Sequence, residues 1–492
     1  MLTILLVLSL LIWFVVFLQQ IGRHGFLVLL LWLLVAPVAL NIIERPGSNP
    51  FVASEKQVLK SPTATSGGYF SNEASIKAKD WLDPTRILLG AFVLFALVDP
   101  LLKKKRLVTL DKTELWMVAF GAILIASVLL DTRRTAFGFR VAIDAFIVPF
   151  MAYFVSRRLI TSETRFRQLG LIIAATGFYV IVIALLERLL LRQGLVAVVQ
   201  GPFESRDLLY IVVATAFFMA LPDQLRDGGF FTKRHLMDRM QQCVICLTPL
   251  IILMTWRRGL WLGFISGVLL FSVLVRRFTS YSRQLAIIGL LLLLTPVVFM
   301  MTQASIFQET VGARLGRENT VYSRFGAWTI TIEEGLKRPF LGIGLNNLRD
   351  VLVHTRTKIA GVKSETHSHN SFLAFFAELG TVGLLAYLMV VGTLFLKGWA
   401  LYRRSTAPRD RWLGISVIAI LAAYLVPALT GSVLHYPSVT HVYVFSYFGA
   451  ITGICGRHLY GRRRNPPSVQ SAHLAMIRSR MKSLQPARYP VA

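Results

Sequence analysis

The sequence is short of charge, of acidic side chains and of cysteine. Only 16% of its 492 residues are charged, whereas a soluble domain carries roughly a quarter, so a soluble enzyme and a disordered chain are excluded. Its 3 cysteines are too few for a secreted disulfide scaffold. Cys243 and Cys246 form a CxxC pair within an apolar run, and we assign it to helix packing rather than to redox or metal chemistry.

What the sequence does have is long apolar runs. Hydrophobic residues make up 55% of the chain, and the mean hydropathy is +0.60. Because about 20 apolar residues cross the hydrocarbon of a bilayer as a helix, we predict an all-α polytopic membrane protein with about thirteen transmembrane helices. The predicted spans are residues 2–20, 25–42, 86–102, 114–130, 141–156, 168–188, 208–222, 242–256, 259–276, 284–302, 371–396, 412–431 and 438–455.

Positive charge sets the predicted orientation. Lys and Arg number 53 against 25 Asp and Glu, a net charge of +28. Basic runs occupy every second connection, which places those connections in the cytoplasm by the positive-inside rule. There is no compact basic domain, so we expect a lipid bilayer and no nucleic acid as partner. The chain then divides into residues 1–302 with spans one to ten, 303–370 as an external segment, 371–455 with spans eleven to thirteen, and 456–492 as a basic, disordered cytoplasmic tail.

The external segment 303–370 contains a predicted helix. In the stretch SRFGAWTITIEEGLKRP, the residues Arg324, Trp328 and Ile332 recur at i, i+4 and i+8, which is typical of one helix face. We expect Gly335 and Pro339 to end this helix.

Several arginines fall on the external side, against the orientation rule. Each can be a side chain that snorkels from a helix end, and Arg140 can be neutralised by Asp144 at i+4. Together they can converge on one anionic group, because the planar guanidinium binds phosphate oxygens bidentately. The external segments carry no motif at metal-ligand spacing, so we predict no metal site and no cofactor. The external arginines that we take as binding candidates are Arg133, Arg134, Arg140, Arg206, Arg257 and Arg258.

A histidine stands where the external segment meets span eleven, in the stretch ETHSHNSFLAFFAELG. Ser368 or Asn370 is expected to cap the helix. The positive end of the helix dipole disfavours a protonated imidazole, so His369 is suited to act as a general base. From spacing alone, a merely polar cap is an equal alternative. Glu378 is out of phase with His369, and we expect Gly380 and Gly383 to admit a neighbouring helix.

At these residues the sequence resembles bacterial O-antigen ligases. His369-Asn370, nine residues and Gly380-x-x-Gly383 match a signature of that family. The stretch from Arg324 to Gly344 resembles its R-x3-W…P-x-x-G-x-G segment, and Arg258-Gly259 its S-R-G element, with Arg257 in place of the serine. The segment 201–207 resembles a Gly-x-Phe element but lacks the usual Asn-Pro-Asn.

The resemblance implies a GT-C-type glycosyltransferase of the bacterial inner membrane, with its active site at the periplasmic face. It implies an undecaprenyl-diphosphate-linked glycan as donor, no metal, Arg258 and Arg324 on the diphosphate, and His369 as the base. Trp328 and Asn370 join the external arginines as predicted substrate-binding residues.

Four functions stay open at this point. A lipid A–core acceptor would make the protein an O-antigen ligase, and a growing glycan would make it an O-antigen or exopolysaccharide polymerase. A protein hydroxyl would make it an O-oligosaccharyltransferase. A membrane transporter is the alternative from another class, and it would be expected to show broken helices and midplane charges.

Overall fold

The computed structural model describes fourteen stretches of the chain, and they contain helices and no strand. The prediction of an all-helical protein is therefore confirmed for this part. Predicted spans 2–20 and 284–302 and most of 25–42 and 86–102 lie outside it. The described residues are 25–27, 29–30, 33, 86, 88–94, 109–130, 135–190, 206–226, 236–255, 258–276, 318–356, 368–431, 433–435 and 439–464.

Five helices in the described part are long and apolar enough to cross a membrane, as expected of a multi-pass membrane protein. They correspond to predicted spans four, five, six, eleven and twelve; the number thirteen stays a prediction. Shorter apolar helices coincide with predicted spans seven, eight and nine. The five are Lys112–Leu130, Gly138–Leu159, Glu163–Val182, Ser371–Arg404 and Pro408–Thr430, and the shorter ones are Tyr210–Pro222, Arg239–Leu253 and Gly259–Val275.

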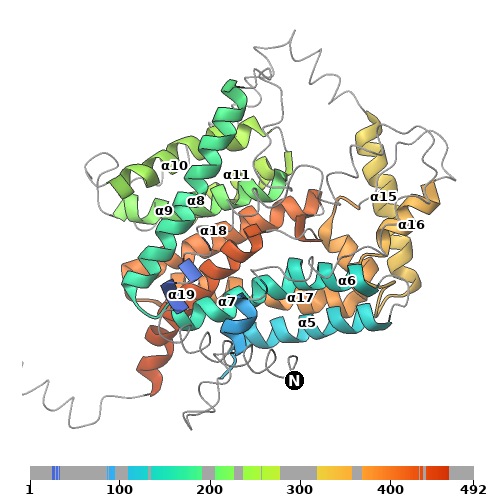
Figure 1. Ribbon diagram of the computed structural model, residues 1–492, viewed down its shortest axis with the longest axis horizontal. Coiled ribbons are helices and arrows are strands. Elements are labelled where there is room, and N and C mark those ends of the chain that lie inside the picture. The colour runs from blue at the N-terminus through green and yellow to red at the C-terminus, as the bar shows by residue number, and fades with distance from the viewer. Residues whose placement is uncertain are drawn as a thin grey trace, which may run out of the picture.

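Helices α17 and α18 pack side by side, and other described helices surround them (Figure 1). Helix α17 lies between α5 and α18, α11 packs along α18, and α7 packs along α19. Helices α15 and α16 lie at one edge, beside α17. The elements are α5 Lys112–Leu130, α6 Thr135–Val141, η2 Ala142–Ile147, α7 Val148–Leu159, α8 Glu163–Leu190, α9 Arg206–Arg226, α10 Leu236–Met254, α11 Arg258–Val275, α15 Glu318–Lys337, α16 Leu348–Arg356, α17 Ser371–Arg404, α18 Pro408–Thr430, η4 Val433–His435 and α19 Val439–Arg464.

A stripe of glycines lets α11 approach α18 closely. Gly259, Gly263 and Gly267 recur every four residues, and a Cβ on each would collide with a side chain or the backbone of α18 or with Phe218 of α9. Small residues at this spacing allow helix backbones to meet in a membrane, where dispersion contacts replace the hydrophobic effect. The stripe fixes the beginning of α11 against the end of α18.

Helix α17 is broken at Gly380, whose φ is 67° and ψ is −171°. The break leaves backbone N–H and C=O groups of α17 without partners in their own helix. The segment Pro339–Gly344, which we call the clasp, forms hydrogen bonds with them. Ile343 and Gly344 donate to the carbonyls of Ala377 and Glu378, both at 2.9 Å, and the amides of Thr381 and Val382 donate to Pro339 and Phe340 at 2.7 and 3.4 Å. Because buried backbone groups without a partner are costly, these bonds compensate for the break.

Two predictions about glycines in α17 are wrong. Gly380 admits the backbone of Phe340 rather than another helix, because a Cβ there would collide with the Phe340 carbonyl. Gly383 makes room for Leu379 of its own helix.

The expectation for Gly335 is also wrong, since α15 continues to Lys337. Gly335 lies inside the helix and leaves space for the Phe376 ring of α17. The helix predicted around Arg324 and Trp328 is otherwise confirmed.

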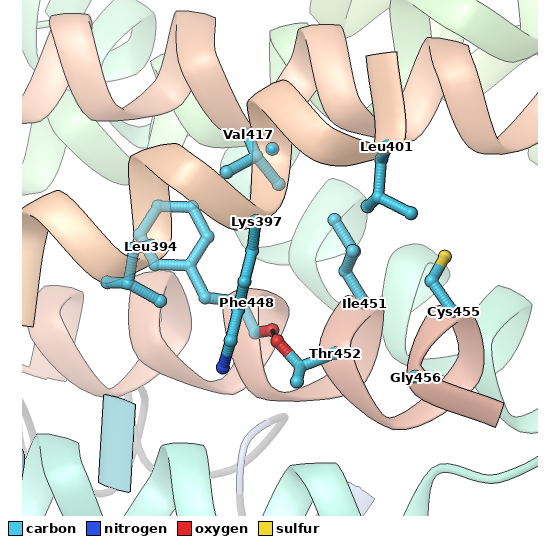
Figure 2. A pocket seen from close by; sticks show the side chains of 10 residues that line it. Leu394, Lys397, Leu401, Val417, Phe448, Ile451, Thr452, Cys455 and Gly456 are labelled. Atoms are coloured by element: carbon cyan, nitrogen blue, oxygen red, sulfur yellow. Dashed lines mark hydrogen bonds between the residues drawn. The ribbon is translucent and has the colours of Figure 1, made fainter. Parts of the chain in front are cut away.

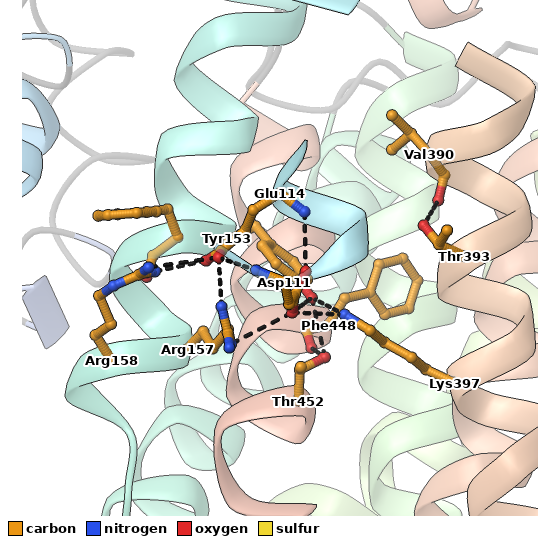
Figure 3. Close-up of polar contacts among 11 residues, drawn as sticks. Asp111, Glu114, Tyr153, Arg157, Arg158, Val390, Thr393, Lys397, Phe448 and Thr452 are labelled. Carbon is orange, nitrogen blue, oxygen red and sulfur yellow. Dashed lines mark hydrogen bonds and ion pairs between the residues drawn. The ribbon is translucent and has the colours of Figure 1, made fainter. Parts of the chain in front are cut away.

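A charge network lies toward the other end of α17, where this helix meets α5, α7 and α19 (Figure 3). It is made of Asp111, Glu114, Tyr153, Arg157, Arg158, Lys397 and Thr452. Asp111 and Glu114 form a capping box for α5, in which each side chain accepts a hydrogen bond from the other's amide, at 2.9 and 3.0 Å. Glu114 is 2% exposed and pairs with Arg157 and Arg158. Lys397 donates to Asp111 and to the Tyr153 hydroxyl, both at 2.7 Å.

A small pocket of about 40 Å³ lies beside this network (Figure 2). Lys397 and Thr452 line it together with apolar residues of α17, α18 and α19, such as Leu394, Val417 and Ile451. At 1.5 Å per residue, Lys397 is roughly 40 Å along α17 from its first residue. The pocket is therefore remote from the beginning of α17.

We predict that Gly380→Ala disrupts the fold. Alanine disfavours the left-handed backbone, and its methyl group meets the Phe340 carbonyl, so we expect a loss of at least about 2 kcal/mol of stability. The measurement is the thermal unfolding of the purified protein in detergent. Gly392→Ala is the control on the same helix, because a Cβ there has nothing within 4 Å. An equal effect of both substitutions would contradict the role of the break.

We also predict that Asp111→Asn destabilises the protein at neutral pH. It removes the carboxylate with which Lys397 and Arg157 pair. A hydrogen bond to a charged group is worth about 1.5–3 kcal/mol. Burial raises the pKa of Asp111, but the Lys397 ammonium, the Glu114 amide and Arg157 together lower it by more, so the folded-state pKa lies below its usual value of 3.8.

Because this folded-state pKa is lowered, the stabilisation from Asp111 is complete above its unfolded pKa and is lost as pH falls through the folded pKa. Thermal unfolding from pH 7 to pH 3 should show an acid loss that is smaller in Asp111→Asn. Arg167→Gln is the control, since that side chain is 66% exposed and an exposed pair contributes little. Identical acid profiles of Asp111→Asn and the unsubstituted protein would contradict the assignment.

Candidate functional site

The beginning of α17 is organised around His369. Asn370 is the N-cap, and its side-chain oxygen accepts hydrogen bonds from the amides of Phe372 and Leu373 at 3.0 and 3.1 Å. The Ser368 hydroxyl donates to the Asn370 carbonyl at 2.8 Å. Between them His369 adopts a left-handed backbone with φ of 50°, which is uncommon for a residue with a Cβ. The capping prediction is confirmed, because the Asn370 side-chain oxygen accepts hydrogen bonds from the first turn of α17.

The end of α18 brings two of the predicted site segments together. The Ser371 hydroxyl at the start of α17 donates to the Gly431 carbonyl at 3.0 Å. Gly259, next to Arg258 at the start of α11, lies directly against Thr430. The helix beginnings that carry His369 and Arg258 are thus neighbours on the last turn of α18.

The third segment, α15, packs on the first turns of α17. Ala327 forms a small apolar cluster with Ala374 and Ala377 of α17 and with Leu348 and Leu352 of α16. Small residues at this contact allow α15 to lie close to α17. Arg324 and Trp328 flank Ala327, one turn before it and directly after it, so they are held at the same contact.

Arg324 and Trp328 carry donors without acceptors. The Nε of Arg324 and the Nε1 of Trp328 are shielded from solvent and donate no hydrogen bond to any of the described residues. The Trp328 ring is held edge-to-face by Phe325, with ring centroids 5.4 Å apart. Two buried donors spaced i, i+4 on one helix are costly when they stay unbonded, and the arrangement can bind an acidic oxygen.

Arg140 takes the pairing that its spacing predicts, with an addition. Its Nε lies 3.7 Å from Asp144, but Arg86 holds the same carboxylate with two hydrogen bonds of 2.6 Å. Sequence reasoning missed Arg86, because a separation of 58 residues leaves no periodic signal. It also missed the capping box of Asp111 and Glu114, for which the D-x-x-E spacing was available.

The remaining predicted binding residues are only partly described. Arg206 and Arg258 are placed as the first residues of α9 and α11, and their side chains lie outside the described part. Arg133, Arg134 and Arg257 lie outside it altogether. Among the side chains that are described, no three of His, Cys, Asp and Glu gather closely enough to hold a metal ion.

Comparisons with known proteins point to one family. No curated protein matches the chain. The family model of the O-antigen ligases matches residues 243–388. This segment runs from within α10 through α11, α15 and α16 into α17, and it includes Arg258, Arg324, Trp328 and His369. The match over residues 243–388 supports the resemblance to the O-antigen ligase and O-antigen polymerase superfamily that the sequence motifs indicate.

Proposed function

We propose that this protein is a glycosyltransferase that moves an oligosaccharide or polysaccharide from undecaprenyl diphosphate to an acceptor hydroxyl at the periplasmic face of the bacterial inner membrane. We favour lipid A–core as the acceptor, which makes the protein an O-antigen ligase. The family match supports this type of function, and the arrangement around α15 and α17 supports the site.

The observation that carries the proposal is the pair of unbonded donors on α15. A guanidinium keeps its charge at any physiological pH and binds phosphate oxygens directionally. The diphosphate of the donor supplies the acceptor oxygens that the Arg324 Nε and the Trp328 Nε1 lack within the protein. Arg258, whose helix begins beside Thr430, is proposed to bind the same diphosphate.

His369 is proposed as the general base. Its imidazole removes the proton of the acceptor hydroxyl while that oxygen attacks the anomeric carbon. The bond between the anomeric carbon and the phosphate oxygen breaks, and its electron pair stays on the leaving diphosphate. The arginines stabilise the charge that develops there, and attack opposite the leaving group inverts the anomeric centre.

The left-handed backbone of His369 fits this role. Such a conformation persists only where its surroundings over-determine it, and it is concentrated at functional sites. Here the Ser368 and Asn370 hydrogen bonds on either side hold it. They fix the direction in which the imidazole leaves the backbone, and a base must be placed within hydrogen-bond distance of its proton.

The broken helix α17 does not favour a transporter. In transporters the unwound backbone of a broken helix coordinates ions. In this protein the freed groups of Ala377, Glu378, Thr381 and Val382 are hydrogen-bonded to the clasp. They are therefore not available to a transported ion.

We predict that Arg324→Gln weakens binding of undecaprenyl diphosphate by roughly 10- to 100-fold, because a hydrogen bond to a charged group is worth about 1.5–3 kcal/mol. Trp328→Phe should have a smaller effect in the same direction. Binding is measured by titrating the purified protein in nanodiscs. Lys337→Gln removes one charge from the same helix at a side chain that is 65% exposed, and it should bind normally. Unchanged affinity in Arg324→Gln would reject the diphosphate site.

We predict that His369→Gly lowers the rate of glycan transfer by about 10²- to 10⁴-fold, the contribution of one general base, and leaves donor binding intact. Glycine accepts the left-handed backbone, so strain is not the cause of the loss, and added imidazole should restore part of the rate. The reaction is followed with purified protein, undecaprenyl-diphosphate-linked oligosaccharide and lipid A–core, by release of undecaprenyl diphosphate.

The same assay identifies the acceptor. Transfer to lipid A–core supports a ligase, whereas elongation of a second lipid-linked glycan, or modification of a Ser- and Thr-containing peptide, would replace that assignment by a polymerase or an oligosaccharyltransferase. If His369→Gly retains the full rate with the preferred acceptor, His369 is not the base. If the unsubstituted protein transfers glycan to none of the three, the proposed function is wrong.

A further inference from the structure

A second histidine lies close to the first turns of α17 and faces a buried carboxylate. The Nε2 of His435, in η4, is 3.5 Å from the Oε2 of Glu378. The side chains of Glu378 and His435 are 6% and 14% exposed. In the part of the chain that the structure describes, the Glu378 Oε2 and both His435 nitrogens are buried and form no hydrogen bond. Each group alone would be costly to bury, and the polar contact between them reduces that cost.

Aromatic rings hold the imidazole in place. Its centroid is 4.5 Å from that of Phe375, at an interplanar angle of 33°, and 6.4 Å from that of Phe146, which meets it edge-on at 89°. Phe375 is one turn before Glu378 on α17. The ring therefore lies along the same stretch of α17 as the carboxylate, and it has little freedom to turn away.

The pair connects the segments that surround His369. The Leu434 amide, next to His435, donates to the Ser371 hydroxyl at 3.2 Å, and Ser371 also holds the end of α18 through Gly431. The carbonyl of Glu378 accepts the hydrogen bond of Gly344 in the clasp. Through these hydrogen bonds, a displacement of η4 would move the first turn of α17, and a displacement of Glu378 would move the clasp.

We propose that Glu378 and His435 are a positioning pair for His369. Facing each other at 3.5 Å, they lock η4 against the first turns of α17 and thereby maintain the left-handed turn that directs the His369 imidazole. The pair acts through His369 and does not itself contact substrate. This inference rests on the proposed function only for its kinetic consequences, because the locking of η4 is a property of the protein without substrate.

The test compares Glu378→Gln, His435→Gln and the double substitution in the full-length protein. Each single substitution leaves a mismatched buried group, and the coupling between contacting residues corresponds to about ten-fold. We expect backbone hydrogen exchange at Phe372–Phe375 and Leu434 to increase about ten-fold in each single variant. The double variant places two amides face to face, and we expect it to recover most of the protection.

The control is a second buried histidine that is paired elsewhere. His441 shares a hydrogen bond of 2.7 Å with the Tyr424 hydroxyl, between α18 and α19. His441→Gln should leave exchange at Phe372–Phe375 unchanged. If it increases exchange there as much as His435→Gln does, or if the two single effects add in the double variant, the pair does not lock η4.

The kinetic arm uses the transfer assay with lipid A–core. A positioning role lowers kcat about ten-fold in each single variant, leaves KM for the lipid-linked donor unchanged and restores kcat in the double variant. A double variant with restored exchange but no recovery of kcat would overturn positioning as the role of the pair. Absence of transfer by the unsubstituted protein would refute the proposed function, while the exchange measurements would still decide whether the pair locks η4.

Discussion

The organisation of this protein depends on the need to hydrogen-bond every buried backbone group. A continuous α17 would meet this need by itself, but α17 is broken at Gly380. The clasp compensates, because its own backbone replaces the missing partners on both sides of the break. The bonds also attach α15 and α16 to α17, since the clasp connects α15 to α16. One backbone constraint thus determines where the helix that carries Arg324 lies relative to His369.

The two ends of α17 use polar groups in different ways. In the charge network, the carboxylates of Asp111 and Glu114 are matched by Lys397, Arg157 and Arg158, which is how buried charge is made tolerable. Near the beginning of α17, the donors of Arg324 and Trp328 have no acceptor. Matched charges fix helices to each other, whereas unmatched donors remain available to a ligand. This contrast assigns the network to the scaffold and supports the α15 contact as part of the proposed site.

The sequence was sufficient for features that depend on local patterns. Apolar runs located α5, α8, α17 and α18, and the helical spacing of Arg324 and Trp328 located α15. Asn370 was predictable as a cap because capping involves residues two and three positions away.

Long-range features were not predictable in this way. The pairing of Arg86 with Asp144, and of His435 with Glu378, depends on how distant helices pack. The break at Gly380 was not predicted either, because a glycine in an apolar helix is equally compatible with close packing against a neighbouring helix. Only the approach of Phe340 distinguishes the two. The motif-bearing segments were recognisable, but their meeting place, the last turn of α18, was not.

That meeting place suggests how the proposed site keeps its geometry while the lipid-linked substrate that we propose enters and leaves. Thr430 lies against Gly259 of α11, and the Gly431 carbonyl accepts a hydrogen bond from the Ser371 hydroxyl of α17. The glycine stripe of α11 and the hydrogen bonds of Ser371 are short-range contacts that tolerate little displacement. Pro427, one turn earlier in α18, packs against Gly263, and its missing N–H leaves a carbonyl of the preceding turn without its usual partner. The geometry of His369 and Arg258 therefore depends more on the rigidity of the α18 end than on the external segment, and substitutions at Gly263 should disturb both residues together.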